Sequence, residues 1–195
     1  MVRHGRIDSS NKELLATGNP HLDEHGGNKH LLAVGEQLRG ISFNVIYCGK
    51  LHRSVETLEV VTTSSGLLKL WITDEFLDDP STYHDGVIYP NVLPSFIEIM
   101  DSIPSYFYDI TRRHGADAKI LMVGGGAEII SMIALSEGLE FHSEVEVQSW
   151  MVRRVIDKKV GFIGTGSIHP FHFNTYSHRV RRVSLEEVHN ARKRR

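Results

Sequence analysis

The chain of 195 residues is 41% hydrophobic and 24% charged, which is ordinary for a soluble globular protein, and its length suits one well-packed domain over residues 1–195. The formal net charge of −2 argues against a general nucleic-acid-binding protein, which needs a basic face, and no apolar stretch reaches the length of a membrane span. The single cysteine, Cys48, excludes an intrachain disulfide, so we expect a reducing compartment and, without a recognisable signal peptide, the cytoplasm.

Short apolar runs alternate with amphipathic stretches along the chain, which is the pattern of an α/β protein. A three-layer α/β/α sandwich with a mainly parallel sheet is therefore expected. In chain order we predict a strand ending at Val2, a helix over 30–39, a strand over 43–48, a helix over 53–65 and a short strand over 68–72. A loop over 74–90 follows, and then a helix over 93–114, which Pro104 kinks or restarts. A buried strand over 119–123 and a helix over 127–135 come next.

The last third of the chain is predicted to add a hairpin and a basic tail. Residues 144–156 and 159–163 indicate two antiparallel strands at the edge of the sheet, whose free edge would suit pairing between copies of the chain in a homo-oligomer. Ser184 and Glu187 have capping-box spacing, which predicts a short helix over 184–192. The Arg-rich tail at about 184–195 is expected to be a solvated terminus rather than a site for an acidic partner.

Arg3, His4 and Gly5 directly follow the first predicted strand, and these residue types suit a phosphoryl group. The carboxyl ends of parallel strands are where α/β proteins place their ligands. Near neutral pH an imidazole is available as a nucleophile, a guanidinium matches the phosphoryl oxygens, and glycine lets the backbone approach a ligand closely. The triplet alone is a weak signal, and its position after a strand is what gives it weight.

Arg53 lies in a second segment of the same kind. The strand over 43–48 leads into His52-Arg53-Ser54 at the start of a helix, where backbone N–H groups and the helix dipole favour an anion. We therefore predict that Arg3, His4 and Arg53 form one pocket and that its partner is a phosphorylated substrate or ligand.

These segments together resemble the histidine phosphatase superfamily, whose members are phosphoglycerate-mutase-like. The resemblance runs from residue 2 to about residue 137. The first part is the Arg3-His4-Gly5 triplet. The second is a helix in which Leu31, Gly35 and Gln37 match the family pattern Leu-x-x-x-Gly-x-x-Gln, with the last spacing one residue short. The third is the segment from Leu51 to Leu58, which matches the family's Arg-Ala-x-x-Thr helix.

The resemblance implies a role for each site residue. His4 would be the phosphoryl acceptor, with Arg3 and Arg53 as phosphate clamps. Glu75 falls where the general acid of the family lies, although a plain loop carboxylate explains it equally well. Its rivals for the acid are Asp74, Asp78 and Asp79. No metal or organic cofactor is implied.

Residues 124–126 depart from the family pattern Val-Ser-His-Gly-Gly. Gly125 stands where a second histidine is expected, and loss of one preorganised donor to a developing oxyanion typically costs about 10²–10³ in rate. Alternatively, the backbone N–H groups at this helix start form an anion cradle, so that Gly125 and Gly126 bind phosphate. A third alternative is that another histidine fills the space, namely His169, His172 or His178.

The remaining histidines form no metal-binding pattern in the sequence. His21, His25 and His30 are separated by glycines that break a helix, and neither His-Glu-x-x-His nor a cysteine pair is present. We therefore expect no metal. His52 and His84 flank the predicted pocket and are candidates to line it.

The sequence favours a phosphatase or mutase-like enzyme that acts through a phosphohistidine at His4 on a phosphorylated small molecule or protein. The competing hypothesis is a catalytically impaired pseudophosphatase that binds a phosphorylated ligand or protein partner, and Gly125 is the residue that favours it. Substrate choice would rest on the loop over 74–90 and on the chain after Gly164, where no pattern identifies the substrate.

Overall fold

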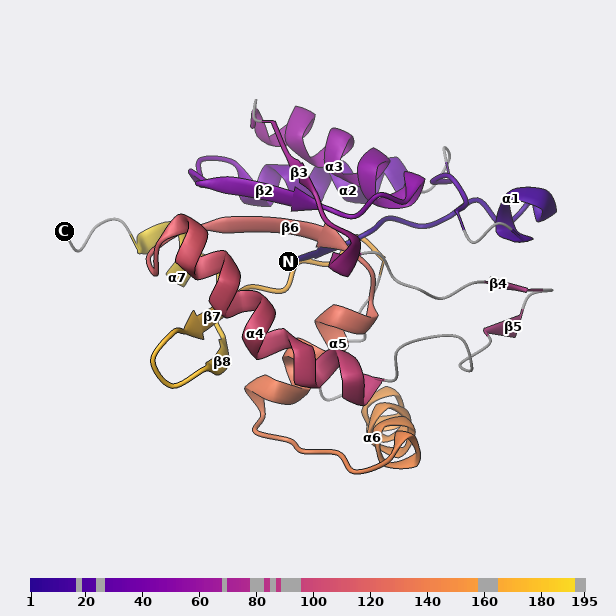
Figure 1. Ribbon diagram of the computed structural model, residues 1–195. Coiled ribbons are helices and arrows are strands. Elements are labelled where there is room, and N and C mark those ends of the chain that lie inside the picture. Colours follow the sequence, from indigo (N-terminus) through magenta and orange to yellow (C-terminus); the bar gives the residue numbers. More distant parts are fainter. Residues whose placement is uncertain are drawn as a thin grey trace.

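Figure 1 shows the computed structural model of the chain, which describes residues 1–16, 19–23, 27–67, 70–77, 83–84, 87–88, 96–157 and 165–191. Its centre is a four-stranded sheet in the order β1-β6-β2-β3, with every neighbouring pair parallel. The strands are β1 (Val2–Arg3), β2 (Val45–Cys48), β3 (Ile72–Thr73) and β6 (Ile120–Gly124). Arg3 is in register with Gly124, and Cys48 with both Val123 and Thr73, so all four strands end at one edge of the sheet.

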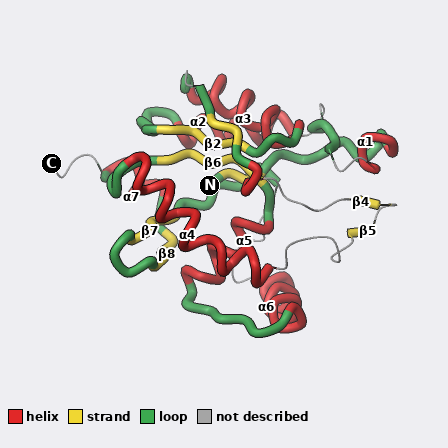
Figure 2. The backbone as a smooth tube through the Cα atoms, in the orientation of Figure 1, coloured by secondary structure: helices red, strands yellow, loops and turns green. Residues whose placement is uncertain are grey.

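Helices cover both faces of this sheet, which confirms the predicted layers (Figure 2). Alternate residues of β2 face opposite sides, because side chains alternate along a strand. Ile46 and Cys48 pack in one core cluster with α2 (Gly27–Leu38) and α3 (His52–Ser65). Val45 and Tyr47 pack in the other with α4 (Phe96–His114) and α5 (Ala127–Ser136). Pro104 lies within α4, which is one helix in the structure.

The hairpin predicted at residues 144–163 is wrong in its first strand, since Glu144–Asp157 forms the helix α6. The alternation Glu144-Val145-Glu146-Val147 imitates a strand, but Ser143 accepts a hydrogen bond from the Glu146 N–H at 3.3 Å and caps a helix, whose acidic first turn suits its dipole. Residues 159–163 lie outside the described part. The antiparallel hairpin is formed instead by β7 (Phe171–Asn174) and β8 (Arg179–Arg182), a separate two-stranded sheet.

The smaller elements lie mostly in segments predicted as loops. They are α1 (Lys12–Ala16), the 3₁₀ turn η1 (Glu75–Leu77), and β4 (Tyr83–His84) paired with β5 (Val87–Ile88). The predicted terminal helix is confirmed as α7 (Leu185–Asn190), with both hydrogen bonds of the Ser184–Glu187 capping box. Residues 192–195 of the basic tail, like Asp78, Asp79 and His25, lie outside the described residues.

The chain from residue 165 to 169 lies along the free side of β1. Ile168 forms an antiparallel bridge with Val2, and the Arg3 N–H donates to the Ser167 carbonyl at 3.0 Å. The short strand β1 is therefore held on both sides, by β6 and by this late segment. No helix among the described residues has the length and apolarity that a membrane crossing requires.

Candidate functional site

His4 leaves β1 at the edge where the parallel strands end, and its side chain is only 6% exposed. Its backbone N–H donates to the Gly124 carbonyl at 2.9 Å, and its carbonyl accepts from the Gly166 N–H at 2.9 Å. The imidazole Nδ1 lies 2.8 Å from the Gly5 carbonyl oxygen. Because a carbonyl only accepts, this contact assigns the proton of the neutral ring to Nδ1 and leaves Nε2 with its lone pair. That is the tautomer in which Nε2 can act as a nucleophile.

The loop after β1 is joined to the start of α3 by a short chain of hydrogen bonds. The Gly5 N–H donates to Thr57 Oγ1 at 2.8 Å, and Thr57 Oγ1 donates to the Arg53 carbonyl at 2.6 Å. Arg53 is 3% exposed in the first turn of the helix. The predicted neighbourhood of the triplet and Arg53 is therefore present, while their roles stay predictions. Thr57 was missed, although its spacing of four from Arg53 puts both on one face of α3.

Gly5 and Gly126 are positions where an added side chain would crowd a neighbouring side chain. A Cβ on Gly5 would lie 2.8 Å from Leu31 Cδ1. A Cβ on Gly126 would lie 3.2 Å from Nε of Arg3. The guanidinium of Arg3 therefore lies against the first residues of α5, whose N-cap is Gly126.

Gly124 and Gly125 lie against η1. A Cβ on Gly124 would come within 2.4 Å of the Leu77 carbonyl oxygen, and the Gly125 N–H donates to that oxygen at 3.1 Å. The N–H of Gly125 is thus used inside the protein. Two statements stay predictions: that Gly125 and Gly126 bind an anion, and that Gly125 replaces a second histidine.

Glu75 is an exposed carboxylate paired with a cation. It lies in η1 at 75% side-chain exposure and forms an ion pair and hydrogen bond with Lys50 Nζ. The hydrogen bond from Lys50, and then its charge, hold the pKa of Glu75 below its usual value. Glu75 is therefore ionised at neutral pH, whereas a general acid must carry a proton.

We expect Lys50→Met to raise the pKa of Glu75 toward its ordinary value, because the variant lacks the cation that favours the carboxylate. A carboxyl whose pKa is lower in the folded state stabilises that state above its unfolded pKa, and this contribution is lost as the pH falls through the folded pKa. The stability effect of so exposed a pair is small, so the measurement is the carboxyl ¹³C shift of Glu75 across acidic pH. The exposed Lys12→Met is the control, and equal titration curves in both variants would contradict the pairing.

Asp74, a rival for the acid, is held by a partly buried tyrosine that the sequence did not point to. The Tyr106 hydroxyl donates to Asp74 Oδ2 at 2.9 Å, and the Phe76 N–H donates to Asp74 Oδ1 at 3.0 Å. Burial, and then the charge of Asp74, raise the pKa of Tyr106, so Tyr106 stays protonated and donates. Glu128, in the first turn of α5, is 2% exposed and adds to the same rise in the pKa of Tyr106. Glu128 could have been noticed in the sequence, because it is the only acidic residue in a mostly apolar helix.

The late histidines lie apart from one another. His169 is buried in the segment beside β1, its Nε2 lies 2.7 Å from Ser167 Oγ, and burial lowers its pKa to about 4, so it is neutral near pH 7. His178 lies at the turn between β7 and β8 with a positive φ of 53°. The side chain of His84 lies outside the described part of the chain.

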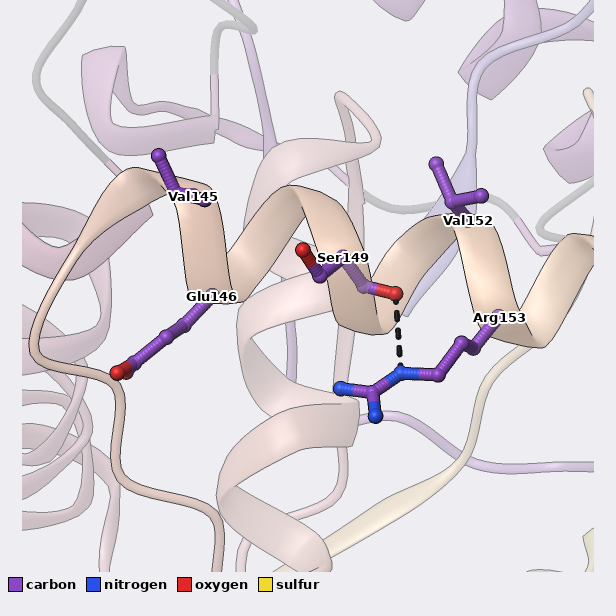
Figure 3. Close-up of a pocket in the computed structure, with 5 residues that line it drawn as sticks. All are labelled: Val145, Glu146, Ser149, Val152 and Arg153. Atoms are coloured by element: carbon purple, nitrogen blue, oxygen red, sulfur yellow. Dashed lines mark hydrogen bonds between the residues drawn. The ribbon is translucent and has the colours of Figure 1, made fainter.

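His4, Arg3 and Arg53 line neither of two surface hollows. Figure 3 shows one of about 550 Å³ on α6, lined by Val145, Glu146, Ser149, Val152 and Arg153, with Arg153 Nε donating to the Ser149 carbonyl at 3.2 Å. The other, of about 970 Å³, is lined by residues such as Asn44, Lys119 and His172, at the opposite ends of β2 and β6. His172 therefore lies at the far edge of the sheet from the turn at Gly125.

Comparisons with known proteins concern the family and the fold. The family model of the histidine phosphatase superfamily (branch 1) matches residues 1–79. Comparison with curated protein sequences gives no match. Among solved structures, the phosphoglycerate mutase from Bacillus anthracis str. Sterne has a TM-score of 0.65 at 15% identity, over 96% of this chain and 92% of that one.

Two phosphatases have the same fold. The protein histidine phosphatase SixA, complexed with tungstate, has a TM-score of 0.61 at 14% identity, over 93% of this chain and 91% of that one. The phosphoserine phosphatase from Entamoeba histolytica, in complex with 3-phosphoglyceric acid, has a TM-score of 0.60 at 17% identity, over 94% and 93%. Residues 1–79 thus carry the sequence pattern of the histidine phosphatase superfamily, and the chain as a whole has the α/β fold of phosphoglycerate-mutase-like proteins.

Proposed function

We propose that this chain, working as one domain, catalyses phosphatase or mutase-like phosphoryl transfer through a phosphohistidine at His4. Nε2 of His4 attacks phosphorus, the ester P–O bond breaks, and the leaving oxygen takes a proton from Glu75 in its protonated form, which Lys50 keeps scarce near pH 7. Water, or an acceptor hydroxyl in a mutase, then gives a proton to the Glu75 carboxylate and attacks phosphorus. The P–N bond breaks, and phosphate or the new phosphate ester leaves the neutral imidazole of His4. Arg3 and Arg53 bind the phosphoryl oxygens, because a guanidinium offers paired donors to them.

The observation that supports this proposal most is the attachment of the His4 loop to the first turns of α3. The bonds from Gly5 to Thr57 and from Thr57 to Arg53 fix the nucleophile relative to a buried arginine. Such fixed placement is what in-line phosphoryl transfer requires. The fold neighbours include phosphatases and a mutase, so the substrate class we propose is a phosphate monoester, small or on a protein. The location we propose is the cytoplasm, on the ground of the single cysteine.

The second candidate is a pseudophosphatase that binds a phosphorylated ligand without useful turnover. Two observations favour it. The Gly125 N–H is donated to Leu77, so at this position neither a side chain nor that N–H is available to a phosphoryl group. Lys50 holds Glu75 in its ionised form, which leaves the proposed proton donor mostly without a proton near pH 7.

Binding and turnover measured on the same tag-free protein test both candidates. Tungstate is the phosphoryl mimic for calorimetry, and p-nitrophenyl phosphate with a panel of phosphate esters is the substrate set. Arg53→Gln is expected to weaken tungstate binding at least about tenfold, the loss typical of a charge-assisted hydrogen bond. The control is Arg112→Gln, which removes an exposed arginine on α4. Arg53→Lys, which keeps the charge, should retain part of the affinity if thermal melting shows that it folds.

The outcomes separate the candidates. Tungstate binding with turnover supports the enzyme, and tungstate binding without turnover of any ester supports the pseudophosphatase. A wild-type protein that binds no tungstate contradicts both. Equal affinities in Arg53→Gln and Arg112→Gln contradict the placement of the phosphoryl group at Arg53.

A further inference from the structure

Two histidines and a glutamate meet beside the first turns of α3. His52 and Glu56 are four residues apart on this helix and therefore share one face. His21 reaches them from the segment of residues 19–23. One ligand atom from each residue, a ring nitrogen or a carboxylate oxygen, lies within 4.8 Å of the other two. The histidine spacings in the sequence gave no sign of this group, because its members come from separate segments.

The backbone holds these three residues together. The Leu22 N–H donates to Glu56 Oε2 at 2.7 Å, while Glu56 Oε1 is hydrogen-bonded to Nδ1 of His21. The His52 N–H donates to Asn19 Oδ1 at 2.7 Å. The rings of His21 and His52 stack with centroids 4.4 Å apart and 20° between their planes. The segment that carries His21 is thus fixed to the helix at two points, so the cluster does not depend on a chance approach of surface side chains.

Two imidazoles and a carboxylate are a ligand set that divalent zinc accepts, with a fourth position left for water or an oxyanion. Zinc binds such atoms at about 2.0–2.2 Å, which places two tetrahedral ligand atoms roughly 3.3–3.6 Å apart. The His21 and Glu56 atoms are already in hydrogen-bond contact, and a pair at the full 4.8 Å needs to close by about 1.2–1.5 Å. His21 is 48% exposed and Glu56 29% exposed, which leaves room for the ring and the carboxylate to rotate. We propose that His21, His52 and Glu56 bind a divalent transition-metal ion of the zinc class.

This site adjoins the predicted phosphate pocket, since His52 precedes Arg53 and Glu56 precedes Thr57, yet the proposal does not depend on phosphoryl transfer. Its experiment measures metal binding directly. Tag-free protein treated with a chelator is titrated with Co²⁺, the visible ligand-field absorption is followed, and Zn²⁺ is then added to displace the cobalt. His21→Ala and Glu56→Gln each lose one ligand. His142→Ala removes an exposed histidine elsewhere and is the matched control.

The wild type and His142→Ala are expected to bind one equivalent of Co²⁺ and to release it to Zn²⁺. In His21→Ala and Glu56→Gln the affinity should fall at least about tenfold, since even outer-shell partners of a metal are typically worth that much. Thermal melting without metal shows that the variants fold. A wild type that binds no metal, or a His21→Ala variant that binds it unchanged, would overturn the proposal. So would a Glu56→Gln variant that loses thermal stability but keeps its metal affinity, because Glu56 would then only anchor the segment that carries His21.

Discussion

Replacing His4 with alanine is expected to lower kcat/KM for p-nitrophenyl phosphate by about 10³-fold or more. This figure is conservative, because removal of the covalent nucleophile from a protease lowers kcat by roughly 10⁶-fold. The reason is the contact between Nδ1 of His4 and the Gly5 carbonyl at 2.8 Å, which leaves Nε2 as the unprotonated atom. No backbone group can replace that nucleophile. A wild-type burst of p-nitrophenol before steady state would report the covalent intermediate, and the variant should show none.

The control for this variant must separate chemistry from folding, because His4 is buried. His4→Gln keeps a side chain that can donate to the Gly5 carbonyl, so it should fold and still lack the nucleophile. His142→Ala should retain the wild-type rate. Tungstate affinity should survive in His4→Gln within a few fold if Arg3 and Arg53 carry the phosphoryl binding. Activity that persists in both His4 variants would exclude the phosphohistidine mechanism.

Two strands of the central sheet, β2 and β6, were predictable because their residues carry a local signature, whereas the strand predicted over 68–72 shares only Ile72 with the exposed strand β3 (Ile72–Thr73). Val45-Ile46-Tyr47-Cys48 and Leu121-Met122-Val123 are short apolar runs between polar segments, which favours a buried strand. The helix α6 was not predictable in this way. Its first four residues alternate like a strand, but Val147 is buried while Val145 is exposed, whereas a strand would place both on one face.

The same distinction applies to the candidate site. Arg3, His4 and Arg53 were placed together because each follows a predicted parallel strand, and parallel strands end at one edge. The hydrogen bond from Tyr106 to Asp74 and the meeting of His21 with Glu56 depend on long-range contacts between separate segments. No local pattern specifies such pairs, so they had to come from the structure.

Gly35→Ala should destabilise the protein by about 2–3 kcal/mol, a drop of roughly 4–12 °C in Tm, although alanine is the better helix former by about 1 kcal/mol. Gly35 lies where α2 crosses α3. A Cβ there would lie 1.7 Å from Ser64 Oγ and 2.7 Å from the Val61 carbonyl oxygen, and the second of these atoms belongs to the helix backbone. Rotation of Ser64 alone cannot relieve the overlap, so the two helices must separate and expose part of the core formed by residues such as Leu31 and Leu58.

A double-mutant cycle with Ser64→Gly identifies the cause of this loss. Ser64→Gly removes the nearer side chain and should cost about 1 kcal/mol alone, as glycine does in a helix. Combined with Gly35→Ala, it should recover part of the lost stability, and the contact with the Val61 carbonyl should keep that recovery incomplete. Urea unfolding gives the four free energies. If Gly35→Ala were instead as stable as the wild type, the close crossing of α2 and α3 would be wrong, and with it the packing that supports Arg53 and Thr57 at the other end of α3.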